Sequence, residues 1–178
     1  GKKADGVVSD DLAEVWRLRR EPDAGKAKPG LRALLYRTTD QIAQINAVLG
    51  LLDLFSPADD KLDEFIALCE EGVRVSQKAK MAGVEAIFES KRGHLLSQKL
   101  GFLEIEHLAS IQMDNAIGLA LFTAAQRKES AETIRAVLKS RATAFQRGIE
   151  LAAKANNAQS MGWVLVNIGA SAGLRAGY

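Results

Sequence analysis

The sequence predicts an all-α protein built from antiparallel helical hairpins. Apolar residues recur at helical spacing along most of the chain, whereas the strict alternation typical of strands is absent. Proline occurs at Pro22, Pro29 and Pro57 and nowhere later, so nothing from residue 58 onward need interrupt a helix. Hydrophobic residues make up 47% and charged residues 26% of the 178 positions, a balance typical of a globular chain with one core.

The first thirty residues are predicted to be a flexible leader with one short helix and a linker. The helix is expected over 10–20, with Ser9 or Asp10 as its cap and Leu12, Val15 and Trp16 as its buried stripe. Residues 21–30 contain two prolines and two glycines, a composition that favours a linker. Residues 31–178 then form a single helical domain.

Six further helices are expected, over about 31–55, 58–81, 84–101, 102–126, 130–155 and 158–176. Ser56 is predicted to cap the second of them, with Pro57 at its first position. The single cysteine, Cys69, lies in an apolar run and is interpreted as a small core residue rather than a reactive thiol. Asn156 and Asn157 are expected to form the last turn.

An internal repeat runs through the second half of the chain. Residues 73–93 align without a gap on residues 149–169 at a shift of 76, which pairs Gly93 with Gly169. A shorter echo pairs 46–48 with 115–117 at a shift of 69. Both patterns indicate a duplication of helical hairpins. Glycine in both copies would let the two helices of a hairpin approach closely.

The recurrent unit resembles the tetratricopeptide repeat family over about residues 68–178. The motifs that carry the resemblance are Glu150-Leu151-Ala152, then Asn156-Asn157, then Asn167-Ile168-Gly169. The resemblance implies an α–α superhelix with a hairpin about every 34 residues. A shift of 76 therefore requires another hairpin and a break near Asp114; without that break the chain is a duplicated three-helix bundle.

The same resemblance implies a concave groove that binds a partner protein or peptide. The residues that would line this groove are Ser90, Lys91, His94, Ser97, Gln98 and Asn167. Lys91 and Asn167 occupy matching positions in the two copies, and in peptide-gripping members of the family such donors hold a carboxylate. Ala172 stands where the family places a bulky aromatic residue.

The sequence contains no recognisable catalytic, metal or cofactor motif. His94 and His107 are 13 positions apart without cysteine or carboxylate partners at ligand spacing, and phosphate-binding and nucleophile motifs are missing. A net charge of 24 − 22 = +2, with the signs interspersed, does not favour nucleic-acid binding, and no run approaches a membrane span. We therefore expect no catalysis, no metal, no cofactor, no nucleic acid and no membrane partner.

The function predicted from sequence is a cytoplasmic scaffold or adaptor that binds a partner protein through a helical groove. The alternative is a ligand-sensing domain of a larger signalling protein, with a pocket lined by Met113, Phe122, Met161 and Trp163. The final helix is apolar around much of its circumference, which a terminal repeat helix should not be. Either further repeats follow Tyr178 or this helix packs on a second copy through Trp163 and Val164.

Overall fold

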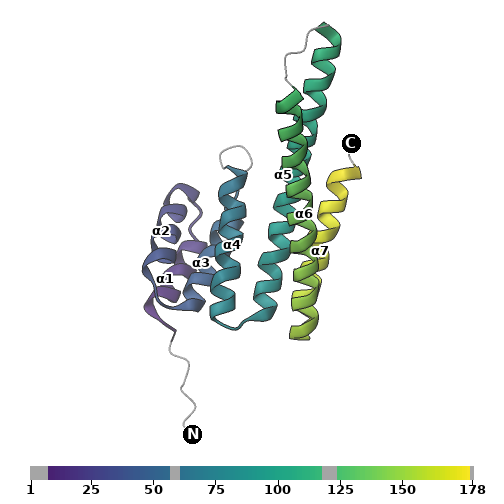
Figure 1. Ribbon diagram of the computed structural model, residues 1–178. Helices are drawn as coiled ribbons and strands as arrows, with labels where there is room; N and C mark the ends of the chain where they lie inside the picture. The colour runs from purple at the N-terminus through teal and green to yellow at the C-terminus, as the bar shows by residue number, and fades with distance from the viewer. Residues whose placement is uncertain (1–7, 57–60, 118–123, 177–178) are drawn as a thin grey trace. The chain divides into compact units, whose positions relative to one another are not determined.

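The computed structural model describes residues 8–56, 61–117 and 124–176, and these ranges are helical without any strand (Figure 1). This confirms the predicted all-α class. The helices are α1 (Asp10–Arg19), α2 (Ala24–Arg37), α3 (Gln41–Asp53), α4 (Leu62–Lys78), α5 (Ala82–Ile117), α6 (Ala124–Ala155) and α7 (Ala158–Ala176). The chain divides into two compact units, 1–85 and 86–178, rather than at residue 30.

Helix α1 begins as the sequence predicts. The Ser9 hydroxyl oxygen accepts a hydrogen bond of 3.1 Å from the Leu12 amide and thereby caps the helix. Leu12 and Val15 are buried, but Trp16 is 41% exposed and Leu18 takes the third core position instead. The prediction for Trp16 was wrong because Leu18, three residues after Val15, faces the same side of the helix.

The predicted linker is largely helix. Helix α2 starts at Ala24, capped by Asp23, and contains Pro29. Ala27 and Leu31 are completely buried, one helical turn apart. Their burial outweighs the poor helix propensity of the glycines and proline, which is why composition alone misidentified this segment.

The single helix expected over 31–55 is two helices. Thr38 has an extended backbone, and Asp40 starts α3 by accepting hydrogen bonds from the amides of Ile42 (2.9 Å) and Ala43 (3.2 Å). The Ser9 hydroxyl also donates to the Asp40 carboxylate. This bond, helped by the two amides, lowers the pKa of Asp40 and ties the start of α1 to the start of α3.

Within the first unit α3 is the central helix, in contact with α1, α2 and α4. Helix α4 is preceded by Lys61 at its cap rather than by Ser56, while Pro57 lies outside the described residues. Phe65 and Cys69 on α4 are buried, which confirms the core position predicted for the cysteine.

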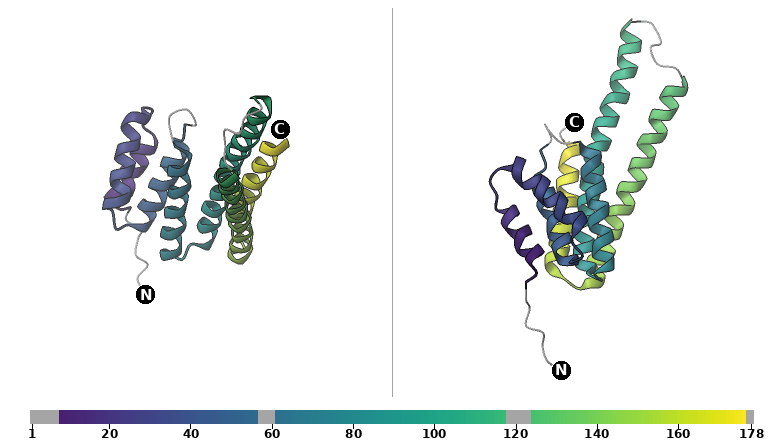
Figure 2. Two further views of the ribbon diagram at one scale, coloured as in Figure 1. Left: turned by 45° about the horizontal axis from the view of Figure 1, so that its top comes forward. Right: turned by 90° about the vertical axis from the view of Figure 1, so that its left-hand side faces the viewer.

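The second unit is formed by α6, α7 and the part of α5 that starts at Ala86 (Figures 1 and 2). Helix α5 is continuous through Gly101 and Asp114, so the break predicted near Asp114 is absent from the described part of this helix. The described residues therefore show no helix boundary at the position that the family spacing required, and residues 118–123, which follow α5, lie outside the described ranges. The boundaries predicted for the last helix are confirmed.

The longer repeat is visible in the backbone. Lys80 (φ 56°) and Asn156 (φ 49°), 76 residues apart, both adopt the left-handed conformation, and α5 and α7 start two residues later at Ala82 and Ala158. The two copies thus share the same turn at equivalent positions. The shorter echo has no such counterpart, because Ala47 is buried in α3 whereas Ala116 is exposed near the end of α5.

The two glycines paired by the repeat have different surroundings. A Cβ atom at Gly93 would lie 2.5 Å from the ring of Phe145 on α6, so this glycine does allow a close approach. A Cβ atom at Gly169 would meet nothing within 4 Å. The close approach at Gly93 is thus to the Phe145 side chain on α6 and not to the hairpin partner that the repeat predicted, and the packing role predicted for Gly169 is wrong.

Candidate functional site

The residues predicted to line a groove lie on α5 and α7, within the second unit, and most of them face each other. Ser90, Ser97 and Asn167 are buried, whereas Lys91, His94 and Gln98 are half-buried. An open concave surface would leave these side chains accessible. The structure instead places them largely between two packed helices.

Asn167 and Ser90 form a buried link between α7 and α5. The Asn167 side-chain amide donates to the Ser90 hydroxyl oxygen over 2.9 Å, and the Ser90 hydroxyl donates to the carbonyl of Ile87, also over 2.9 Å. Both polar groups are therefore paired inside the protein, as buried polar groups must be. Ser97 is satisfied within α5 by donating to the Gly93 carbonyl (3.0 Å).

His94 extends this link one helical turn further. Its Nδ1 lies 3.1 Å from the Ser171 hydroxyl oxygen, and that hydroxyl donates to the Asn167 carbonyl (2.7 Å). Since the Ser171 proton is used, Nδ1 must carry the proton that Ser171 accepts. Nε2 is then left as the acceptor for the Gln98 side-chain amide at 3.2 Å.

This arrangement requires a neutral imidazole. Burial lowers the pKa of His94, and the positive charge of Lys91 lowers it further. Asn167 and Ser171, one turn apart on α7, contact Ser90 and His94, one turn apart on α5, so the two helices run in the same direction. We call Ser90, His94, Gln98, Asn167 and Ser171 the α5–α7 seam. The polar side chains of the seam form hydrogen bonds with groups of this same chain.

Only one of the two residues predicted at an interface is accessible. Val164 is completely buried, on the same side of α7 as Asn167 and Ser171. Trp163 is 51% exposed and points elsewhere. Trp163 is therefore no core residue, and an interface on α7 must use its side of the helix.

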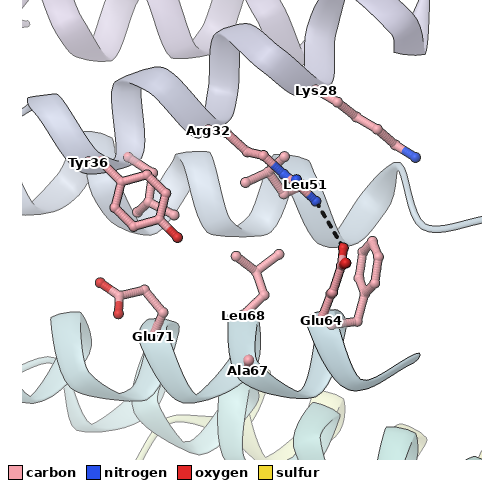
Figure 3. Close-up of a pocket in the computed structure, with 10 residues that line it drawn as sticks. Lys28, Arg32, Tyr36, Leu51, Glu64, Ala67, Leu68 and Glu71 are labelled. Atoms are coloured by element: carbon pink, nitrogen blue, oxygen red, sulfur yellow. Dashed lines mark hydrogen bonds and ion pairs between the residues drawn. The ribbon is translucent and has the colours of Figure 1, made fainter. Parts of the chain in front are cut away.

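The first unit contains a groove that the sequence did not predict. It runs between α2 and α4 above α3, encloses about 440 Å³, and is shown in Figure 3. We call it the α2–α4 groove. Its lining residues are Lys28, Arg32, Leu35, Tyr36, Leu51, Glu64, Phe65, Ala67, Leu68 and Glu71.

The floor of the α2–α4 groove is apolar and firmly held. Leu35, Leu51 and Phe65, from three different helices, are each only 2–3% exposed. Leu68 projects between the two rims, and Tyr36 is 78% exposed at one end (Figure 3). A large aromatic side chain so exposed beside an apolar floor is typical of the anchors found in protein interfaces.

The two rims of the groove carry opposite charges. Lys28 and Arg32 lie on α2, and Glu64 and Glu71 lie on α4, where the Glu71 carboxylate also pairs with Arg74 of the same helix (Figure 3). Arg32 spans the groove to Glu64 at 3.4 Å, with both side chains about half exposed. An ion pair of this exposure contributes less than about 1 kcal/mol, so a partner can displace it.

Sequence spacing contains the signal for this groove. Lys28, Arg32 and Tyr36 recur every four residues, and Glu64, Leu68 and Glu71 recur at four and three, which places each set on one helix face. The linker predicted over 21–30 conceals the first set, because it leaves Lys28 outside any expected helix. The second set has the composition of an ordinary solvated helix face, so it carries no distinguishing signal.

A second hollow of about 520 Å³ lies between α5 and α6 and is lined by Met113, His107, Ser130 and Arg127, among others. Here His107 Nδ1 lies 3.1 Å from the Ser130 hydroxyl, and Arg127 pairs with the buried Asp114. Of the residues predicted to enclose a ligand, only Met113 lines it. Trp163 is exposed on α7, and Phe122 lies outside the described residues.

Comparisons of the chain with protein-family models, curated proteins and solved structures found no match. Among the described residues, no three His, Cys, Asp or Glu side chains are placed to hold a metal ion together. None of the described helices combines the length and apolar character needed to cross a membrane. The class that fold and site define is therefore a helical protein with an open, charge-polarised groove.

Proposed function

We propose that this chain is a protein-interaction module that holds an amphipathic helix of a partner protein in the α2–α4 groove, without a catalytic step of its own. The observation that carries the proposal is the combination of an apolar floor with two rims of opposite charge. A helix laid into a groove presents apolar side chains at intervals of three and four residues. The volume of the groove accommodates a few such side chains.

The charge arrangement would fix how the partner lies. Acidic side chains on one flank of the partner helix would face Lys28 and Arg32, and basic side chains on its other flank would face Glu64 and Glu71. The reversed helix would place like charges together, which is costly, so the rims supply orientation and selectivity more than affinity. Affinity would come from apolar contacts with Leu68 and Tyr36.

This function differs from the sequence prediction in its location. The predicted helical groove around Lys91 and Asn167 is replaced by the α2–α4 groove in the first unit, while the predicted partner class, a protein or peptide, is retained. Binding to a scaffold of this kind needs no change in the helices themselves, since three of the floor residues are already buried in the free protein.

The test is a selection from a display library of helical peptides, followed by measured affinities for single variants. Selected peptides should carry apolar residues at helical spacing with acidic residues on one flank and basic residues on the other. Glu71→Lys reverses one rim charge and should weaken the selected peptides about tenfold, the scale of a close charge pair lost at an interface.

Glu70→Lys is the matched control, because Glu70 is exposed on the same helix but does not line the groove. It makes the same change of charge one residue away and should leave affinity unchanged. Equal losses in the two variants, or peptides without a charged flank, would remove the support for the proposal. Leu68→Glu should abolish binding while the far-ultraviolet circular dichroism stays helical.

A further inference from the structure

Helix α7 buries several polar side chains and exposes several large apolar ones. Ser160, Asn167 and Ser171 are at most 8% exposed, whereas Leu165 and Val166 are 57% and 58% exposed. No charged residue occurs between Lys154 and Arg175 in the sequence. A helix of a soluble domain normally shows the opposite pattern, so the outward face requires a partner.

We propose that this face binds the same face of a second copy of the chain, with the two α7 helices antiparallel about a two-fold axis near Val166. The contacting strip consists of five residues at helical spacing: Gly162, Trp163, Val166, Gly169 and Ala170. This interface lies in the second unit and does not depend on the α2–α4 groove.

The strip fits itself better than it fits an arbitrary partner. Trp163 stands three residues before Val166 and Ala170 four residues after it, on the same edge of the strip. A two-fold axis at Val166 therefore brings Trp163 of each copy beside Ala170 of the other. Because a two-fold axis repeats every contact, this packing of a large side chain against a small one occurs twice in the interface.

The opposite edge of the strip is hollow in a matching way. Gly162 stands four residues before Val166 and Gly169 three after it, so the same axis brings Gly162 of each copy beside Gly169 of the other. A Cβ atom at either glycine would meet nothing within 4 Å, which shows that this surface is open. The two backbones can approach closely there, and the uncharged strip places no like charges together.

The surface area that the two helices bury determines how strong the dimer should be. One pair of helices of this length buries less than the 1,200–2,000 Å² of a standard stable interface, so the dimer should be weak and reversible. Sedimentation velocity over a concentration series should show a monomer that converts to a dimer at high concentration. A monomer at every concentration up to the solubility limit would overturn the proposal.

Gly169→Leu is the decisive substitution. A Cβ atom at this position would meet no neighbour in the free chain, and leucine is a better helix former than glycine, so the monomer should be at least as stable as the wild type. In the dimer leucine blocks the close approach, and the dissociation constant should rise at least tenfold. Ala142→Leu, a comparable gain in size at an exposed position on α6 and away from α7, is the control and should leave the dimer intact.

The antiparallel arrangement of the two α7 helices is tested by cross-linking. Chains carrying Gly162→Cys and chains carrying Gly169→Cys should form a disulfide-linked dimer when mixed and oxidised, and neither variant should do so alone. Cys69 gives no background because it is completely buried. A parallel pair would cross-link each variant to itself, and a dimer that persists in Gly169→Leu would place the contact elsewhere; either result would overturn the antiparallel strip.

Discussion

At the scale of single residues, His94 is the group whose protonation state is most tightly specified. Its Nδ1 proton is accepted by Ser171, and its Nε2 lone pair receives the Gln98 amide. A second proton on the ring would point at that amide, donor against donor. The cationic form is therefore disfavoured by geometry as well as by the burial that lowers the pKa of His94.

This predicts a stability that declines in mild acid. The folded chain binds the His94 proton more weakly than the unfolded chain, whose histidine has a pKa of about 6.5. The contribution of His94 is complete above that pH and is lost as the pH falls from there to the lowered pKa of the folded state. Urea unfolding of wild type and His94→Gln over this interval measures it. The substitution should flatten the pH dependence; equal slopes in the two proteins would contradict the link.

Sequence reasoning at this scale identified residues better than it identified their surroundings. Ser90, His94, Gln98 and Asn167 were singled out as a set, and the structure does bring them together. They were expected on an open surface because spacing along one helix shows which residues share a face but not what covers that face. The covering helix, α7, contributes Ser171, which lies one turn beyond Asn167 and carried no signal of its own.

At the scale of helices, the repeat supplies a matched pair of substitutions. Gly93→Ala places a Cβ atom 2.5 Å from the Phe145 ring, which must then leave its packed position at a cost of about 1–3 kcal/mol. Gly169→Ala meets no neighbour and gains up to about 1 kcal/mol of helix propensity.

Urea unfolding at concentrations too low for self-association should therefore give opposite signs at two positions that the sequence makes equivalent. Gly93→Ala should lower the free energy of unfolding, although its own gain in helix propensity offsets part of the loss. Gly169→Ala should raise it. A stabilising effect of the same size at both positions would show that Phe145 moves aside freely.

Helix boundaries show where sequence patterns are sufficient. The start of α7 at Ala158 was predictable because Asn156 and Asn157 mark the turn. The Asn157 side-chain oxygen accepts hydrogen bonds from the amides of Gln159 and Ser160. The break at Thr38 was predictable in principle from Asp40, a good capping residue, but apolar periodicity on both sides concealed it. The helix around Pro29 was not predictable, since only tertiary burial of Ala27 and Leu31 accounts for it.

At the scale of the whole molecule, the two proposed interfaces belong to different units. The α2–α4 groove uses residues 28–71, and the strip on α7 uses residues 162–170. Neither surface shares a residue with the other. The protein would then be a dimer that presents two copies of one binding groove, which can raise the apparent affinity for a partner with two helices.

Independence of the two surfaces is testable with variants already defined. Gly169→Leu should leave the affinity for a single selected peptide unchanged, and Glu71→Lys should leave the dimer unchanged. Titration calorimetry should give one peptide per chain in both monomer and dimer. A peptide that binds only the dimer would show that the groove is incomplete in one chain and would contradict the separation.

The uncharged sequence of α7 has a practical consequence for following this helix in solution. Trypsin cleaves after lysine and arginine, and neither occurs between Lys154 and Arg175. Digestion therefore releases the entire outward strip, with Asn167 and Ser171 of the seam, in a single peptide that starts at Ala155. Covalent labels introduced by hydroxyl radicals survive digestion, so the labelling of that one peptide reports on both surfaces of the helix at once.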